Sequence, residues 1–219
     1  MAHTIEGSRI AHAFELASAV GKEVSALVQT LDDLIDERIQ ASCVTYEFFD
    51  SAEESVLYDD EDWVCMNYAG SFPLITRKKG PGKRKSYPDV YLAYQISLSG
   101  PGTLGGDNPE PLLHVLCLES AVDFAEDHYV GGALLKDYPW ILEGESLIRW
   151  LSEEDNATET GEWAFSLKLT SLNSSQDLEE KIVNPAIALL NGKSSQEALP
   201  STLGGLVRFR KEDDRLIIQ

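Results

Sequence analysis

The chain has 219 residues, of which 43% are hydrophobic, and a formal net charge of -19. This length and composition predict a folded protein with a substantial core. The 37 Asp and Glu residues outnumber the 18 Lys and Arg residues and would repel polyphosphates, which argues against general nucleic-acid binding. Because no window holds the roughly 18 apolar residues that span a bilayer and no secretory signal pattern is present, we expect a cytoplasmic protein without membrane contacts.

The first predicted element is a long amphipathic helix from Ser8 to about Gln40. Its apolar residues recur at alternating steps of three and four: Ile10, Ala13, Ala17, Val20, Val24, Leu27, Leu31 and Leu34. Thr30 and the two aspartates after it could cap a second helix, so a split at this point remains open. The periodicity predicts one helical face that must be covered by other apolar groups.

The apolar stripe of this helix is wider than the seam of a two-stranded coiled coil, because Phe14, Val28 and Ile35 flank it. We therefore expect the helix to pack across a sheet of its own chain. The side chains expected to be buried there are Phe14, Val20, Leu27 and Leu31.

The next segments are short and rich in β-branched and aromatic residues, as strands are. The acidic run over residues 50–62 predicts an exposed loop. The predicted strands are "WVCMNYAG", "FPLITRK", "VYLAYQISL", "LLHVLCL", "EWAFSLKLTSL", "GLVRFRK" and "RLIIQ". "LLHVLCL" is apolar almost throughout and should be central, whereas the alternation in "EWAFSLKLTSL" predicts that the face bearing Ser166, Lys168 and Thr170 meets solvent.

Further helices are predicted at Glu145 to Glu154 and from about Ser175 to a C-terminal cap at Gly192, with a kink at Pro185. Ser194 and Glu197 have the spacing of a capping box.

Together these elements predict a single α+β domain over residues 1–219, with the long helix at about 8–40 and the sheet and other helices at about 63–219. The sheet should have about five to seven strands, mostly antiparallel with a mixed sheet left open. The long N-terminal helix and a helix in the C-terminal half should pack on it.

The sequence carries no strong catalytic or cofactor signature. Glu119, Asp123, Asp127 and His128 could share one helical face and bind a divalent cation, but acidic residues are so common here that a solvated face is the preferred interpretation. Pro88-Asp89 and Glu119 resemble the order of acidic residues in the PD-(D/E)xK nuclease family. Position 121 is Ala, however, where that family has the lysine that orients water. We expect no catalytic residues, no metal and no cofactor.

One basic segment stands out in the acidic chain. Six of the 18 Lys and Arg residues fall within residues 77–85: Arg77, Lys78, Lys79, Lys83, Arg84 and Lys85. Gly and Pro at its centre and strands on both sides predict a hairpin tip. This clustering predicts a contact with another protein, or with phosphate or nucleic acid through this loop alone; a solvated turn is the alternative.

The sequence thus predicts a non-enzymatic binding or regulatory protein that uses the basic loop as its contact. The alternative is a metal-dependent, nuclease-like enzyme acting on a phosphate-containing substrate, with the loop as anion clamp. The oligomeric state is left open.

Overall fold

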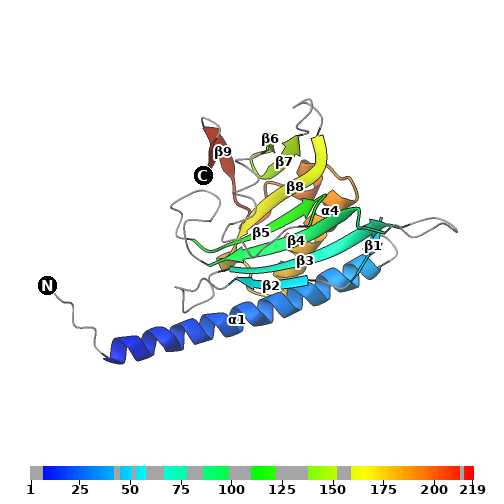
Figure 1. The fold of residues 1–219 in the computed structure, drawn as a ribbon. Helices are drawn as coiled ribbons and strands as arrows, with labels where there is room; N and C mark the ends of the chain where they lie inside the picture. Colours follow the sequence, from blue (N-terminus) through cyan, green and yellow to red (C-terminus); the bar gives the residue numbers. More distant parts are fainter. Residues whose placement is uncertain are drawn as a thin grey trace.

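The computed structural model describes residues 7–41, 45–50, 53–57, 67–77, 86–98, 110–121, 138–151, 159–212 and 215–219. Its main feature is one antiparallel sheet in the order β1-β3-β4-β5-β8-β7-β6, with β2 also paired to β3 (Figure 1). The strands are β1 (Tyr46–Phe48), β2 (Glu53–Leu57), β3 (Asn67–Thr76), β4 (Val90–Ser97), β5 (Leu112–Leu118), β6 (Trp140–Glu143), β7 (Leu147–Leu151) and β8 (Glu159–Lys168). A separate hairpin joins β9 (Phe209–Glu212) to β10 (Arg215–Ile218).

Two longer helical elements cover one face of this sheet. The first is α1 (Gly7–Gln40), and the second runs through α3 (Ser175–Leu178), a π-helical stretch η2 (Glu179–Val183) and α4 (Asn184–Leu190). The 3-10 turn η1 (Leu169–Ser171) and the short helix α5 (Ser195–Ala198) flank the second. This arrangement confirms the predicted α+β fold with an antiparallel sheet, a long N-terminal helix and a helix in the C-terminal half. None of the described helices is long and apolar enough to cross a membrane.

The sheet is buried on both of its faces. The larger core lies between one face and the helices, and it joins Leu31 and Ile35 of α1 to Leu92 of β4, Phe165 of β8 and Ile182 of η2. The smaller core lies on the opposite face, with side chains from β5, β7 and β9. β5 is completely buried along its length, as predicted for a central strand.

The second helix contains the irregularity that Pro185 predicts. Pro185 has no N–H to donate, and the turn just before it is π-helical, with the Asn184 N–H donating to the Glu179 carbonyl. The helix ends as expected at Gly192, which has a positive φ of 78°. The capping box of α5 is also confirmed.

The helix α1 is continuous, so the predicted alternative of a split at Thr30 is wrong. The Thr30 hydroxyl donates to the Ala26 carbonyl one turn back (2.8 Å) instead of capping a new helix. Its C-terminal half is buried as expected, with Leu31 fully buried and Leu27 partly buried. Phe14 and Val20 are exposed, so the prediction that the sheet covers them is wrong.

Several local predictions from the sequence were also wrong. Residues 147–151 form strand β7, paired with the unpredicted β6, instead of the helix expected from Glu145. A left-handed turn at Gly144 and Glu145, with φ of 59° and 65°, joins these two strands and explains the hairpin. The acidic run expected to be a loop contains β2, which pairs with the edge of β3.

Two strands predicted on either side of Ser71 are one continuous strand, β3, which contains Pro73. Pro73 is tolerated because β2 pairs with residues 67–71 of β3 and β1 pairs with residues 74–76, so Pro73 falls between these two partners. On β8, Ser166 is fully buried rather than solvent-facing, because the second core covers that face too.

Candidate functional site

The basic segment connects two strands that pair with each other. β3 and β4 are antiparallel, with Leu74 opposite Val90, so the flanking strands of the predicted hairpin are confirmed. Asp89 closes the base of the connection, because its carboxylate accepts hydrogen bonds from the Thr76 N–H and hydroxyl, each 2.8 Å long. The described ends of the segment, at Thr76 and at Asp89, are therefore fixed to the sheet.

Of the six basic residues predicted to form the contact, the structure describes Arg77. Its guanidinium donates to the carbonyls of Ile39 at the end of α1 (2.6 Å) and Tyr46 of β1 (2.9 Å), and lies 3.8 Å from the Glu47 carboxylate. Arg77 thus joins three elements of the fold. The other five residues, Lys78, Lys79, Lys83, Arg84 and Lys85, lie outside the described residues, and their predicted contact remains a prediction.

The residues behind the metal-dependent alternative are only partly described. Asp123, Asp127 and His128 lie outside the described residues. Glu119 directly follows β5 and accepts a hydrogen bond from the Gly161 N–H (3.1 Å). Among the residues that the structure describes, no three His, Cys, Asp or Glu side chains come together to hold a metal ion.

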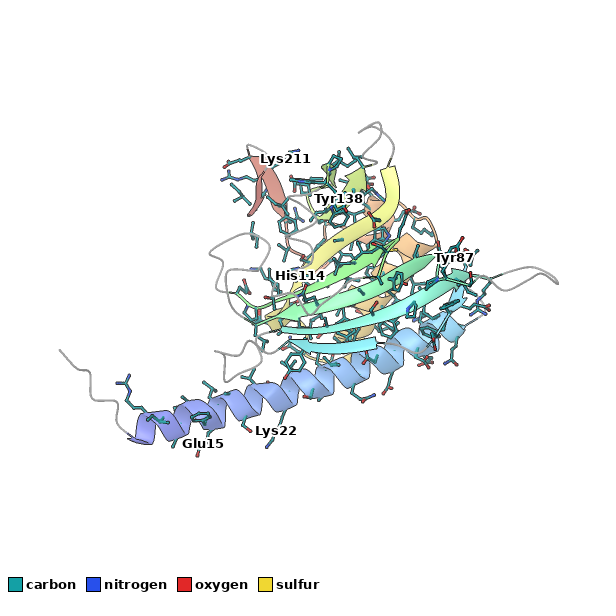
Figure 2. The ribbon with its side chains drawn as sticks, in the orientation of Figure 1. Glu15, Lys22, Tyr87, His114, Tyr138 and Lys211 are labelled. Carbon is teal, nitrogen blue, oxygen red and sulfur yellow. The ribbon has the colours of Figure 1, made fainter. Side chains whose placement is uncertain are left out.

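A row of buried polar residues crosses the middle of the sheet. Gln95 on β4 lies opposite His114 on β5, which in turn lies opposite Ser166 on β8, and all three are fully buried. The His114 Nδ1 and the Ser166 hydroxyl are 2.7 Å apart and share a hydrogen bond. Figure 2 shows His114 within the sheet, away from the labelled surface residues.

Burial decides the protonation states of His114 in this row and of Cys117 on the same strand. It lowers the pKa of His114 to about 3, so the imidazole is neutral at physiological pH. Burial, helped by the nearby Glu162 and Glu119 carboxylates, raises the pKa of the Cys117 thiol to about 12. Both side chains are therefore buried and uncharged at physiological pH. Neither has the exposed, activated state that a nucleophile or proton carrier needs.

A second polar cluster joins the β6–β7 hairpin to α5. The Glu143 carboxylate accepts hydrogen bonds from the Ser195 hydroxyl and the Arg149 Nε, both 2.6 Å long. Burial opposes ionisation of Glu143, but these two donors outweigh it and lower the pKa of this carboxyl group. A cavity of about 390 Å³ adjoins Ser195 and Gly144. The cluster fastens two elements and leaves no carboxylate oxygen of Glu143 without a donor.

The C-terminal half of α1 is held to the body by polar contacts as well as by its core residues. The Tyr94 hydroxyl donates to Asp32 (2.9 Å), and Arg38 forms an ion pair with Glu179. Tyr94 can lie across β3 because Gly70 has no side chain; a Cβ at position 70 would be 2.6 Å from the Tyr94 ring. Together with the Arg77 contact, these bonds fix the helix from about Asp32 onward.

The N-terminal half of α1 projects beyond the sheet, as Figure 1 shows in blue. Its apolar face continues the stripe that is buried farther along the same helix, yet it remains in solvent. The large exposed apolar residues are Ile10, Phe14, Leu16 and Val20, and Leu16 is the most exposed at 59%. Single exposed apolar residues are ordinary, but four within three helical turns form a continuous patch of the kind that marks contact sites.

An apolar groove begins where α1 leaves the body. It has a volume of about 590 Å³, and α1 forms one wall with residues from Val20 to Thr30. The opposite wall comes from the ends of β4 and β5, from η1 and from the start of α3. The apolar residues of that wall are Leu98, Pro111, Leu169, Leu172 and Leu178. Val20 belongs to both the groove and the exposed patch, so the two form one continuous apolar surface.

Sequence reasoning identified the apolar stripe but not this surface. Helical periodicity shows which face is apolar, and it does not show where the covering sheet ends. One signal was available: the segment Gly7–Lys22 carries Arg9 and Lys22 against a single acidic residue, Glu15, whereas the whole chain is at -19. Comparison with protein-family models, with curated proteins and with solved structures found no match.

Proposed function

We propose that the protein is a non-enzymatic binding protein and that the projecting half of α1, Gly7–Val20, is its contact element. One observation carries the proposal: Ile10, Phe14, Leu16 and Val20 are exposed on a helix whose remaining large apolar residues are buried or partly buried. Exposed apolar area is unfavourable in water, so a surface of this kind is stabilised when a partner covers it.

The chemistry of the described residues supports a binding role over catalysis. His114 and Cys117 are buried and neutral, and Glu143 is engaged by Ser195 and Arg149. The projecting segment, by contrast, presents no titratable cluster and a wide apolar face, which is the composition of an amphipathic helix that binds in a groove. We place this binding activity in the cytoplasm, in keeping with the free, buried thiol of Cys117.

The experiment uses a pair of matched variants of the full chain. Leu16→Glu puts a charge on the apolar face, whereas Ser18→Glu puts the same charge about 200° farther round the helix, on the side turned away from Leu16 and Val20. Ser18 is exposed, and glutamate is a good helix former at both positions. We expect Leu16→Glu to abolish complexes detected by chemical cross-linking and mass spectrometry in the native host, and Ser18→Glu to retain them. Equal loss or equal retention in both variants would contradict the proposal.

The basic segment 77–85 is a second candidate contact of the same binding protein. Its support is the clustering of positive charge on a connection whose two ends are fixed by β3 and by the Asp89 bonds to Thr76. Because Arg77 holds α1 and β1, the intermolecular contact depends on the other five residues. The metal-dependent alternative has no comparable support among the described residues.

The variant that tests this contact therefore keeps Arg77 and changes the other five basic residues to Ser: Lys78, Lys79, Lys83, Arg84 and Lys85. Stability should change by less than about 0.5 kcal/mol per residue if these five side chains are exposed as the sequence predicts, because exposed charges contribute little. Binding to a polyanion such as heparin or to an acidic protein should be lost, and in the wild type it should weaken steeply with salt. Binding that is unaffected by the five substitutions would leave the segment as a solvated turn.

A further inference from the structure

The structure contains two complementary surfaces, an exposed apolar helix and an apolar groove beside it. We propose that the partner of the projecting half of α1 is a second copy of the same chain, whose groove it enters in a symmetric antiparallel dimer. This inference rests on the proposed function, because it names the partner of the same surface. Four observations support a second copy as the occupant.

The first observation is continuity. Val20 is part of the exposed patch and also of the groove, so it lies at the junction of the two surfaces. In an antiparallel pair of helices with a two-fold axis at Val20, Leu16 of one copy lies beside Val24 of the other, and Ala13 lies beside Leu27. Both Val24 and Leu27 line the groove. The two-fold symmetry repeats each contact, so both patches are covered at once.

The second observation is the direction of the remaining side chains. The two-fold axis places the bodies of both copies on the same side of the helix pair. Ile10 and Phe14 follow the same helical face as Ile35 and Ile39, which point toward the body of their own chain. In the dimer Ile10 and Phe14 therefore point toward the body of the other copy. There they meet the far wall of its groove, formed in part by Leu98, Leu169 and Leu172.

The third observation is charge. A chain with a net charge of -19 repels its own copies over most of its surface. The projecting half has no excess of negative charge, since within Gly7–Val20 Arg9 balances Glu15, and Glu23 is the one charged residue among the described residues that line the groove. A contact through this segment therefore brings two acidic molecules together where repulsion is weak.

The fourth observation is size. Gly7–Val20 is about 20 Å long at 1.5 Å per residue. The 15 residues that line the groove and the six on the apolar face of this segment, Ile10, Ala13, Phe14, Leu16, Ala17 and Val20, have Val20 alone in common, so each copy offers about 20 residues to the contact. A stable interface of standard size uses about 20 to 30 residues on each side, which the two sets together supply. The surface is therefore large enough for a specific dimer.

The first test is sedimentation velocity of the full chain from about 1 to 200 µM, a range that detects micromolar dissociation constants. We expect a monomer–dimer equilibrium that Leu16→Glu weakens by roughly tenfold or more, because a symmetric interface contains the substitution twice. Ser18→Glu should associate like the wild type. A wild type that is monomeric throughout, or association that Leu16→Glu does not weaken, would overturn the inference.

The second test determines the register. Val20→Cys lies on the proposed axis, so under mild oxidation it should form an intermolecular disulfide with its own counterpart, identified by mass spectrometry as the 20–20 link. Ser18→Cys lies about 160° round the helix from Val20, away from the proposed axis, and should not form such a link. Dimers without the 20–20 link would contradict this arrangement.

The two proposals fail differently. If the chain is monomeric while a different protein is captured by the wild type and lost with Leu16→Glu, the second copy is the wrong partner and the contact element stands. If a small apolar ligand fills the groove, a fluorescent fatty acid should bind with unchanged affinity in Leu16→Glu, and the dimer inference is contradicted. If Leu16→Glu affects neither self-association nor capture, both proposals fail.

Discussion

The two halves of α1 have the same three-and-four spacing of apolar residues and opposite environments. Leu31, Ile35 and Ile39 are buried against the sheet, whereas Phe14 and Leu16, in line with them or flanking them, are more than half exposed. Burial of the first group is reinforced by the Tyr94–Asp32 hydrogen bond and by Arg77 at the helix end. The comparison shows that the same sequence pattern can form a core in one place and an exposed surface in another.

The contrast also explains how the projecting half stays helical. An isolated helix as short as Gly7–Val20 is marginal in water, because nucleation is unfavourable. Here the docked half supplies the nucleus, and the projecting half continues from it with several alanines, which favour helix most strongly. Its presentation in solvent is therefore a consequence of the anchored half.

The largest effect on stability is expected when a buried leucine of the docked half is replaced, compared with an exposed leucine of the projecting half. Leu31→Ala should destabilise the fold by about 2 to 5 kcal/mol, the usual range for a fully buried leucine. Leu16→Ala should change stability by less than about 0.5 kcal/mol when the protein is monomeric. Chemical unfolding at sub-micromolar concentration measures both. Similar losses in the two variants would mean that the projecting half is covered within its own chain.

This comparison also shows how much the sequence could predict. Periodicity predicted α1 within one residue of its ends, and the continuous apolar run at residues 112–118 predicted a central strand. The extent of the sheet depends on pairings between distant strands, which no local pattern contains. For the same reason Ser166 was expected in solvent, although its cross-strand partner His114 is buried beside it.

The basic segment and the groove also differ in how much of each the sequence reveals. Clustering of Lys and Arg is visible in the sequence, but the part that Arg77 plays in holding α1 follows from the tertiary contacts to Ile39 and Tyr46. The groove is formed by side chains from elements far apart in the chain, so its residues could be identified only once the fold was known.

The next comparison is between substitutions at two glycines, Gly70 in the body and Gly21 next to the projecting half. Gly70→Ala places a Cβ 2.6 Å from the Tyr94 ring, so the ring must move from Asp32, and we expect a loss of about 1 to 3 kcal/mol. Gly21→Ala meets no atom within 4 Å and removes a poor helix former, so we expect a gain of about 0.5 to 1 kcal/mol. Thermal unfolding measures both, and effects of the same sign would contradict the difference between the halves.

A further effect concerns pH and is confined to the body of the protein. Below pH 6.5 the unfolded chain takes up a proton at His114, whereas the folded chain does not, because burial lowers the pKa of this group to about 3. The contribution of neutral His114 to stability is fully present above pH 6.5. The free energy of unfolding should fall by about 1.4 kcal/mol per pH unit between roughly pH 6 and pH 5, where most carboxylates remain ionised.

His114→Asn keeps a hydrogen-bonding side chain beside Ser166 and should flatten this pH dependence. His12→Asn on the projecting half is the matched control, and it should keep the wild-type slope because His12 is exposed. Urea unfolding at several pH values measures the slopes. A wild-type slope in the His114 variant would show that another group takes up the proton.

Amide hydrogen exchange of the full chain at two concentrations tests the central claim most directly. At about 1 µM we expect residues 7–20 to exchange much faster than residues 24–39, because the projecting half lacks tertiary cover. At about 200 µM residues 7–20 and the groove wall near Leu169 should become protected in the wild type and in Ser18→Glu, but not in Leu16→Glu. Uniform protection along α1 at both concentrations would contradict the account.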